Sequence, residues 1–177
     1  MARETGRIER SPRTDGRPYD QSVEQPALIR CPVCGRQNRV RPAAKGAPHC
    51  GACGAPLPWV TESSEADFAA VVEQSDLPVL VDFWAPWCAP CRVVSPIVER
   101  MGQDLRGELK VVKVNSDTAP TLSARFNIRA IPTLIVFDHG RVADRVTGAL
   151  SADALRTWVR QHLPPKSAGR AVGGGQA

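Results

Sequence analysis

The motif Cys88-Ala89-Pro90-Cys91, which three residues separate from the apolar run 79–84, places the strongest constraint on the fold of this chain. A buried strand leading into a helix at this point puts the two sulfurs one helical turn apart, with the first at the helix N-terminus. Backbone N–H groups and the helix dipole stabilise a thiolate there. Because the thiolate is the attacking species in thiol-disulfide exchange, we predict that Cys88 is the nucleophile and that Cys91 resolves the mixed disulfide. A structural zinc knuckle is the alternative, and the apolar strand together with Pro90 in the first helical turn disfavours it.

Four other cysteines form two Cys-x-x-Cys pairs, each followed by glycine, and fifteen residues separate the pairs. They are Cys31, Cys34, Cys50 and Cys53. This spacing is typical of a four-cysteine zinc site, in which the glycines permit tight turns around the sulfurs. Two local disulfides or four free thiols are the alternative, and the regular spacing favours the metal. One structural or regulatory Zn²⁺ ion is therefore expected, whereas the adjacent His49 is expected to be a loop residue.

The residues beyond the first motif resemble the thioredoxin family. The similarity is carried by segments 83–92, 112–115, 125–133 and 147–149, and it covers about residues 60–163. It implies a thioredoxin fold, an α/β structure with a central mixed sheet flanked by helices, and no bound organic cofactor. Ala89 and Asn127 stand where the family commonly has glycine, and asparagine tolerates a positive φ. With the preceding zinc-binding module, the chain resembles the zinc-containing cytosolic thioredoxins of bacteria.

The resemblance also implies roles for residues around the cysteine pair. A lone carboxylate in an apolar strand is expensive to ionise, so Asp82 is expected to have a raised pKa and to accept the proton of Cys91. The alternative is a structural Asp bonded to backbone or water. Lys113 is expected near this carboxylate as a supporting residue, although by its spacing it is equally an ordinary surface lysine. The residues expected to contact substrate are Trp87, Pro90, Ile131, Pro132 and Gly148, with Pro132 in the cis form in this family; for an isolated X-Pro bond, trans is the more common form.

We predict a protein-disulfide reductase that acts on client proteins through its dithiol. The family implies that an NADPH-dependent thioredoxin reductase recycles the oxidised pair. Two other classes of function stay open: a redox-switched binding protein that releases zinc on oxidation, and a nucleic-acid-binding zinc module fused to a thioredoxin domain.

The net charge of +5 raises the question of a nucleic-acid partner, and its distribution disfavours one. Residues 1–60 hold ten Lys and Arg against five Asp and Glu, whereas residues 61–163 hold eleven against thirteen. The basic excess therefore lies outside the catalytic part. The basic residues near the zinc cysteines also lack the interleaved aromatic residues on which bases stack.

Composition divides the chain into four parts. We expect a disordered tail at 1–28, a zinc-binding module at 29–58, a thioredoxin domain at 59–163 and a disordered Gly/Pro-rich tail at 164–177. The proline-rich join 55–58 suggests that the module and the domain are stabilised separately. No apolar stretch is long enough to span a membrane and no apolar core of a signal peptide is present, so we expect a cytoplasmic monomer.

Local patterns predict the elements that carry these residues. A helix is expected to open with a capping box at Ser64 and Asp67, and another to begin at Ser151. Strands are expected at 79–83, 109–114, 133–137 and 141–147.

Overall fold

The computed structural model describes residues 26–165 of the chain. The expected tails at 1–28 and 164–177 lie mostly outside these residues, and β1 begins inside the first of them. In chain order the elements are β1 (Ala27–Arg30), β2 (Gln37–Val40), β3 (Val60–Glu62), the short π-helical segment η2 (Ala69–Glu73), β4 (Val79–Trp84), α1 (Ala89–Asp104), β5 (Lys110–Asn115), α2 (Pro120–Arg125), β6 (Thr133–Asp138), β7 (Arg141–Thr147) and α3 (Ala152–Arg160). None of the helices in this part of the chain is both long and apolar enough to cross a bilayer.

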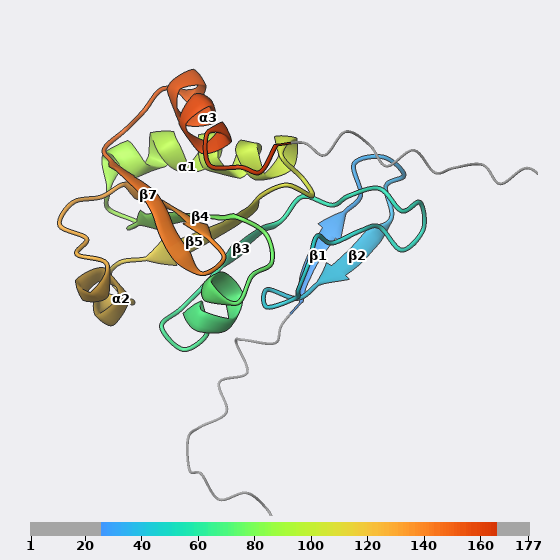
Figure 1. Ribbon diagram of the computed structural model, residues 1–177, viewed down its shortest axis with the longest axis horizontal. Coiled ribbons are helices and arrows are strands. Elements are labelled where there is room, and N and C mark those ends of the chain that lie inside the picture. Colours follow the sequence, from blue (N-terminus) through green and yellow to red (C-terminus); the bar gives the residue numbers. More distant parts are fainter. Residues whose placement is uncertain (1–25, 166–177) are drawn as a thin grey trace, which may run out of the picture.

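Five strands form the main sheet, in the order β3-β5-β4-β6-β7 (Figure 1). β3 and β4 run parallel to β5, whereas β6 is antiparallel to β4 and β7 is antiparallel to β6. The mixed sheet flanked by helices confirms the predicted fold class. β4 lies in the middle of the sheet and is buried up to its last residue, as expected for a strand that is covered on both faces.

Helices cover both faces of the main sheet (Figure 1). α1 and α3 contribute Val98 and Leu155 to an apolar core on one face. η2 contributes Val71 and Val72, and α2 contributes Leu122, to a second core on the other face. Neighbouring residues of β4 alternate between the two cores, with Leu80 in the first and Val81 in the second. Both cores hold β4 in place, and β4 in turn fixes the point at which α1 begins.

Three local predictions can be compared with the structure. Ser151 is the N-cap of α3, as predicted, and its side chain accepts a hydrogen bond from the Ala154 N–H. At the other site, the Asp67 carboxylate accepts from the Ser64 N–H at 2.6 Å and also from the Ser64 hydroxyl. This is only the acidic half of a capping box. Asn127 adopts a φ of 50°, the left-handed conformation that asparagine tolerates.

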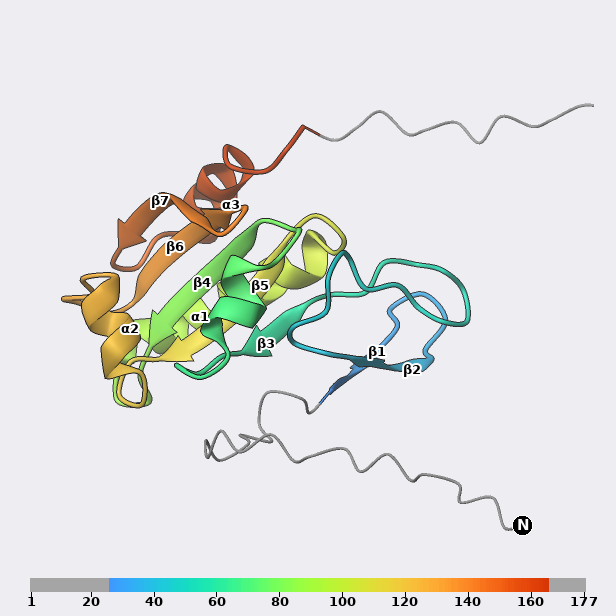
Figure 2. The ribbon, with the colours of Figure 1, turned by 60° about the horizontal axis from the view of Figure 1, so that its bottom comes forward.

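Residues 26–57, here called the four-cysteine segment, contain a separate two-stranded antiparallel sheet, β1-β2 (Figure 2). The small core of the segment contains Cys31 and Cys50 together with Leu57 and Trp59, which are 0% and 1% exposed. This packing differs from the expectation that the proline-rich join keeps the two parts independent. The join carries apolar side chains into a core that the four-cysteine segment shares with the rest of the chain.

A buried lysine makes a second connection between the four-cysteine segment and residues 58–165, here called the main-sheet segment. Lys110, the first residue of β5, is 0% exposed. Its Nζ donates to the Pro42 carbonyl at 2.6 Å and to the Val71 carbonyl, and it lies 4.2 Å from the centroid of the Trp59 ring. Burial lowers the pKa of Lys110 to about 8, against a smaller opposing effect of Asp67. The amine therefore ties backbone groups of the two segments together.

Candidate active site and four-cysteine cluster

The Cys88–Cys91 pair lies at the start of α1, shortly after the end of β4. Cys88 is the N-cap residue of α1, and it forms a disulfide with Cys91 in the first turn, with a Cα–Cα distance of 5.3 Å. The backbone N–H of Cys91 also donates to Cys88 Sγ at 3.2 Å. Once the disulfide is reduced, the same N–H and the helix dipole stabilise a thiolate on Cys88.

Asp82 lies in β4, two residues before the strand ends, and its side chain is 0% exposed. Its Oδ2 accepts a hydrogen bond from the Ser95 hydroxyl at 2.8 Å, whereas Oδ1 is buried and has no partner among residues 26–165. Burial raises the pKa of Asp82; the Ser95 hydrogen bond and the charge of Lys113 lower it, and Glu99 raises it further. The net shift of the Asp82 pKa is upward.

Lys113 lies opposite Asp82 in the β4-β5 register. Its Nζ pairs with Glu99 Oε1 at 2.7 Å and lies 4.9 Å from the centroid of the Trp84 ring. The ion pair is therefore with Glu99, and Asp82 receives only the field of the lysine. A cavity of about 270 Å³ has Lys113 and Glu99 in its wall together with Ser95 and Cys91. It connects the region of the second cysteine to the surface.

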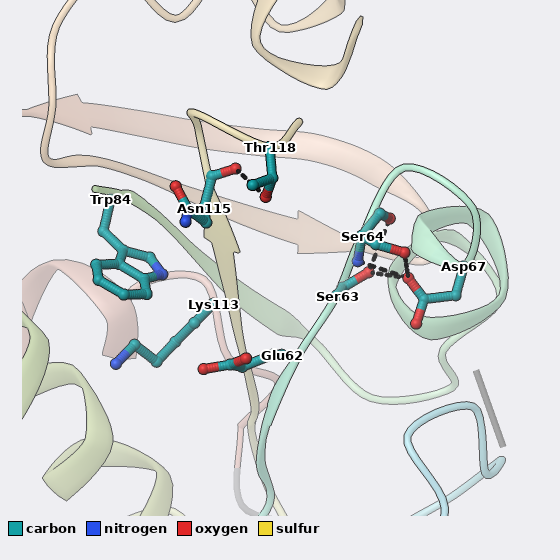
Figure 3. A pocket seen from close by; sticks show the side chains of 8 residues that line it. All are labelled: Glu62, Ser63, Ser64, Asp67, Trp84, Lys113, Asn115 and Thr118. Carbon is teal, nitrogen blue, oxygen red and sulfur yellow. Dashed lines mark hydrogen bonds between the residues drawn. The ribbon is translucent and has the colours of Figure 1, made fainter. Parts of the chain in front are cut away.

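A larger open hollow, of about 480 Å³, also has Lys113 and Trp84 in its wall (Figure 3). The Lys113 side chain extends between Trp84 and Glu62. The remaining lining residues are Ser63, Ser64, Asp67, Asn115 and Thr118. Two of the serines donate to the Asp67 carboxylate. The lining holds no cysteine or histidine, so this hollow adds solvent access beside Lys113 rather than a second reactive centre.

The segment before β6 faces the cysteine pair. The Ile131-Pro132 peptide bond is cis, as the resemblance implied. Cys88 Sγ lies 3.7 Å from the Ile131 carbonyl oxygen, and Ile131 packs in the small cluster that contains both cysteines. Gly148, with φ of 96°, donates its N–H to the Pro132 carbonyl, and a Cβ placed on it meets no atom within 4 Å. This leaves open space beside the cis bond that a side chain at Gly148 would occupy.

Trp87 and Pro90 flank the disulfide on its outer side. Trp87 is 69% exposed, and its Nε1 donates to both carboxylate oxygens of Asp117, at 3.2 and 3.0 Å. Pro90 is exposed in the first turn of α1. Trp87 also shares a surface hollow with Ile131 and Arg129. The expected substrate-contacting residues therefore lie around one face of the cysteine pair.

Sequence reasoning missed three residues that donate to or accept hydrogen bonds from the predicted site residues: Ser95, Glu99 and Asp117. Ser95 had a detectable signal, because it stands one helical turn after Cys91 on a helix face that is otherwise apolar. Glu99 accepts from Lys113, 14 positions away, and Asp117 accepts from Trp87, 30 positions away. No local sequence pattern predicts contacts over such separations.

The comparison with known proteins agrees with this geometry. Residues 58–161 match the family model for thioredoxin. The thioredoxin of Porphyra purpurea is 44% identical over 104 residues, which are 59% of this chain and 97% of that protein. Thioredoxin 1 of a Nostoc species is 46% identical over 100 residues, 56% of this chain and 94% of that protein. The thioredoxin of Haemophilus influenzae is 39% identical over 104 residues, again 59% of this chain and 97% of the relative.

This chain belongs to the thioredoxin family. It is accordingly a thiol-disulfide oxidoreductase, and the disulfide Cys88–Cys91 lies within the matched region. The four-cysteine segment lies outside the residues that the family model matches.

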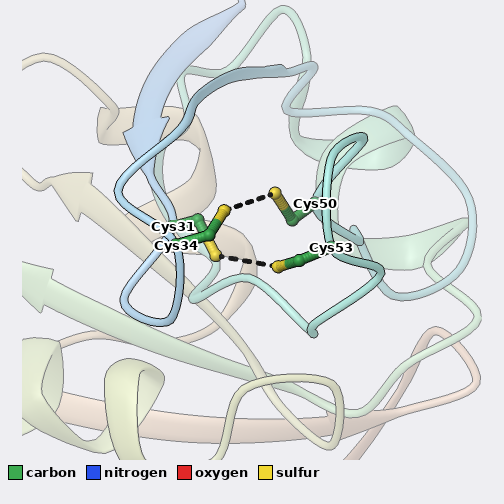
Figure 4. Close-up of side chains that lie close together, drawn as sticks. All are labelled: Cys31, Cys34, Cys50 and Cys53. Atoms are coloured by element: carbon green, nitrogen blue, oxygen red, sulfur yellow. Dashed lines mark hydrogen bonds between the residues drawn. The ribbon is translucent and has the colours of Figure 1, made fainter.

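The four remaining cysteines converge in that segment (Figure 4). The sulfurs of Cys31 and Cys53 are 3.7 Å apart, those of Cys34 and Cys50 are 3.6 Å apart, and all four lie within 4.8 Å of one another. Sulfurs around a tetrahedral Zn²⁺ ion lie ~3.8 Å apart, given Zn–S bonds of about 2.3 Å. The cluster can therefore hold a metal ion. The exposed His49 instead bonds through Nδ1 to its own loop, as predicted.

The thiols of the cluster differ in their pKa values. Backbone N–H groups of Ala52 and Cys53 lower the pKa of the Cys50 thiol to about 6, and a similar bond from Cys34 lowers the pKa of Cys31. For Cys53, the Ala55 N–H lowers the pKa, but the neighbouring sulfurs raise it more, to about 12. Four thiolates cannot share so small a space without a cation. Asn38 Nδ2, 3.7 Å from Cys50 Sγ, adds an outer hydrogen bond to the cluster.

Proposed function

We propose that the chain reduces disulfides of client proteins through Cys88 and Cys91. The observation that carries the proposal is the position of Cys88 at the N-terminus of α1, beside the cis Ile131-Pro132 bond. The Cys88 thiolate attacks one sulfur of the client disulfide, and the other client sulfur leaves as a thiolate. One client sulfur is then covalently bound to Cys88 in a mixed disulfide.

Cys91 completes the reaction by releasing the client. Its thiol gives a proton to the Asp82 carboxylate, and the resulting thiolate attacks Cys88 Sγ. The bond between Cys88 and the client breaks, the client leaves fully reduced, and the enzyme keeps the Cys88–Cys91 disulfide. The unpartnered Oδ1 of Asp82 and the raised pKa of that carboxyl support the role of proton acceptor.

The client is proposed to bind as an extended strand along Ile131. Within residues 26–165 the Ile131 backbone makes no hydrogen bond to another backbone group, and its carbonyl oxygen contacts Cys88 Sγ at 3.7 Å, so its N–H and C=O can pair with such a strand beside the reacting sulfur. Gly148 leaves room for the client backbone, and Trp87 and Pro90 contribute exposed contact surface. Lys113 supports the site through its field on Asp82.

We also propose that the chain divides into a zinc-binding module at 29–58 and a thioredoxin domain at 59–163, as in thioredoxin 2, the zinc-containing thioredoxin of bacteria. Cys31, Cys34, Cys50 and Cys53 would hold one Zn²⁺ ion, which neutralises the thiolates and cross-links the two knuckles. A cytoplasmic compartment is consistent with free thiols, and an NADPH-dependent thioredoxin reductase is the proposed electron donor.

Insulin reduction driven by NADPH and a thioredoxin reductase tests the assignment. Cys88→Ser is expected to lose all activity, whereas Cys91→Ser is expected to accumulate covalent client complexes on non-reducing gels. The two variants control for each other, because each keeps one sulfur of the pair. Complexes that accumulate with Cys88→Ser rather than with Cys91→Ser would reverse the two roles.

One observation favours a second candidate, redox-controlled release of the metal. The sulfur-sulfur contacts of 3.7 and 3.6 Å join different Cys-x-x-Cys pairs, so the proposed oxidation links Cys31 to Cys53 and Cys34 to Cys50. Mild peroxide treatment with parallel measurement of zinc release and insulin reduction separates the candidates. Zinc release that precedes any loss of reduction supports a switch, and the opposite order contradicts it.

A further inference from the structure

Ser95 is an unusual residue on the buried face of α1. The inward residues near it, Val94, Val98 and Met101, are apolar, and Ser95 itself is only 9% exposed. A serine inside a helix commonly bonds back to the carbonyl four residues earlier. Here the hydroxyl instead crosses from the helix to the sheet and donates to Asp82 Oδ2 at 2.8 Å.

This hydrogen bond makes the two oxygens of the Asp82 carboxylate unequal. Oδ2 is occupied by Ser95, whereas Oδ1 has no partner within residues 26–165. Ser95 also stands one helical turn after Cys91, so both residues lie on the same face of α1. A bond to Oδ2 fixes the plane of the carboxylate and reserves Oδ1 for another donor.

We propose that Ser95 is a positioning residue for disulfide exchange: its hydroxyl orients Asp82 and stabilises the carboxylate that accepts the proton of Cys91. The inference rests on the role proposed above for Asp82. The serine transfers no electrons and forms no covalent bond. Its effect is to keep the proton acceptor charged at lower pH than burial alone would allow.

The other groups around Asp82 do not replace this bond. Burial is the largest influence on the pKa of Asp82 and raises it, and the Ser95 hydrogen bond is the largest influence that lowers it. Lys113 on β5 acts in the same direction but is ion-paired with Glu99 on α1, whose charge acts against it. On the β6 side, the register partner of Asp82 is the apolar Leu134.

The cavity beside Ser95 provides a route to solvent for the proton that Asp82 accepts. Its volume of about 270 Å³ is large enough for several water molecules, and Cys91, Ser95, Glu99 and Lys113 provide polar groups in its wall. After Asp82 has taken the proton of Cys91, water in this cavity can carry it to the surface. The positioning hydroxyl therefore lies between the buried carboxylate and solvent.

The test compares Ser95→Ala with Ser95→Thr, which keeps a hydroxyl. The readout is the pH dependence of client release from the mixed disulfide, measured in stopped flow. Without the hydrogen bond the Asp82 carboxyl requires a higher pH to ionise, so Ser95→Ala is expected to release client roughly tenfold more slowly near pH 6 and almost normally above pH 8, which corresponds to a pKa change of about one unit. Ser95→Thr is expected to restore the profile.

Ser75→Ala is the matched control, because it removes another buried serine hydroxyl, one that donates to the Leu77 carbonyl away from the site. It is expected to leave the profile unchanged. Alanine is a better helix former than serine, so Ser95→Ala is expected to fold. A direct NMR titration of the Asp82 carboxyl in that variant gives a second reading, with a higher midpoint expected.

Asp82→Asn distinguishes a failure of the role proposed for Asp82 from a failure of the inference about Ser95. If Asp82→Asn leaves the pH profile unchanged, the proton-acceptor role is wrong. If Asp82→Asn changes the profile but Ser95→Ala does not, only the inference about Ser95 is overturned. A Ser95→Ala effect that persists on the Asp82→Asn background would also overturn it, because the serine would then act by another route.

Discussion

The main-sheet segment and the four-cysteine segment bury their side chains in different ways. The main-sheet segment has an apolar core on each face of a five-stranded sheet. The four-cysteine segment has one small core, in which Cys31 and Cys50 stand beside Val40, and Leu57 and Trp59 complete it at the junction. A segment of about thirty residues buries too little surface to fold alone. It is therefore expected to depend on the proposed Zn²⁺ ion and on the side chains that it shares with its neighbour.

The difference indicates that the four-cysteine cluster is linked to the rest of the chain through packing rather than through the Cys88–Cys91 pair. The cysteine pair and the four-cysteine cluster belong to separate packing groups. The two segments nevertheless share Trp59, and Lys110 bonds to a carbonyl of each. Loss of order in the four-cysteine segment is thus expected to lower the stability of the main sheet more than it lowers the reactivity of the cysteine pair.

Metal removal is expected to have the largest effect. Structural zinc contributes on the order of 10–16 kcal/mol in comparable peptides, so chelation is expected to abolish hydrogen-exchange protection around Cys31–Cys53. Exposure of Leu57 and Trp59 is expected to lower the midpoint of thermal unfolding by about 10 °C. Insulin reduction at 25 °C is expected to fall less than about twofold. Restoration by Zn²⁺ but not Mg²⁺ is the control, and an unchanged midpoint would show that the segments are independent.

Trp59→Ala tests the shared core directly. Removal of a fully buried tryptophan is expected to destabilise the metal-loaded protein by about 3–5 kcal/mol in urea unfolding. Trp87→Ala is the matched control for stability, because that side chain is 69% exposed and its loss is expected to change stability by less than about 1 kcal/mol. Equal effects of the two variants would contradict a shared core at the junction.

Lys110→Met tests the second connection through the pH dependence of stability. Between pH 8 and 10.5 the unfolded chain holds the Lys110 proton more tightly than the folded chain, so the contribution of this lysine to stability rises with pH across that window. The stability difference between wild type and Lys110→Met is expected to rise by up to about 3 kcal/mol.

Urea unfolding at several pH values provides the measurement for Lys110→Met. Titration of the cysteines affects both proteins and cancels in the difference. Lys45→Met, an exposed lysine of the four-cysteine segment, is expected to change stability little. A flat difference curve for Lys110→Met would mean that the amine is not desolvated at the junction.

Asp82→Asn is expected to have the smallest effect on stability, in the opposite direction. The raised pKa of Asp82 means that the folded protein binds this proton more tightly than the unfolded chain, so its contribution falls as pH rises from about 4 through the folded pKa. At pH 7 the variant is expected to be more stable by about 1–3 kcal/mol, while client release slows. A variant that is less stable at pH 7 would argue for a structural carboxylate.

Much of both sites could be read from short stretches of sequence. The spacing of Cys88 and Cys91 after an apolar strand predicted the disulfide at a helix start, and the paired spacing of the other cysteines predicted a cluster. The N-cap at Ser151 and the positive φ of Asn127 also follow from local chemistry. The capping box at Ser64 was only half correct, because the Ser64 hydroxyl donates to the Asp67 carboxylate and does not cap the helix.

The sequence by itself determined which atoms can react, because sulfur spacing, helix caps and strand periodicity depend on residues within a few positions of each other. Only the tertiary structure decided what surrounds those atoms. The Ser95 hydroxyl reaches Asp82 because α1 packs on β4, and the Lys110 amine reaches a carbonyl 68 positions away because the four-cysteine segment packs beside β5. Such contacts depend on how whole elements pack, and packing is a property of the complete fold rather than of any segment.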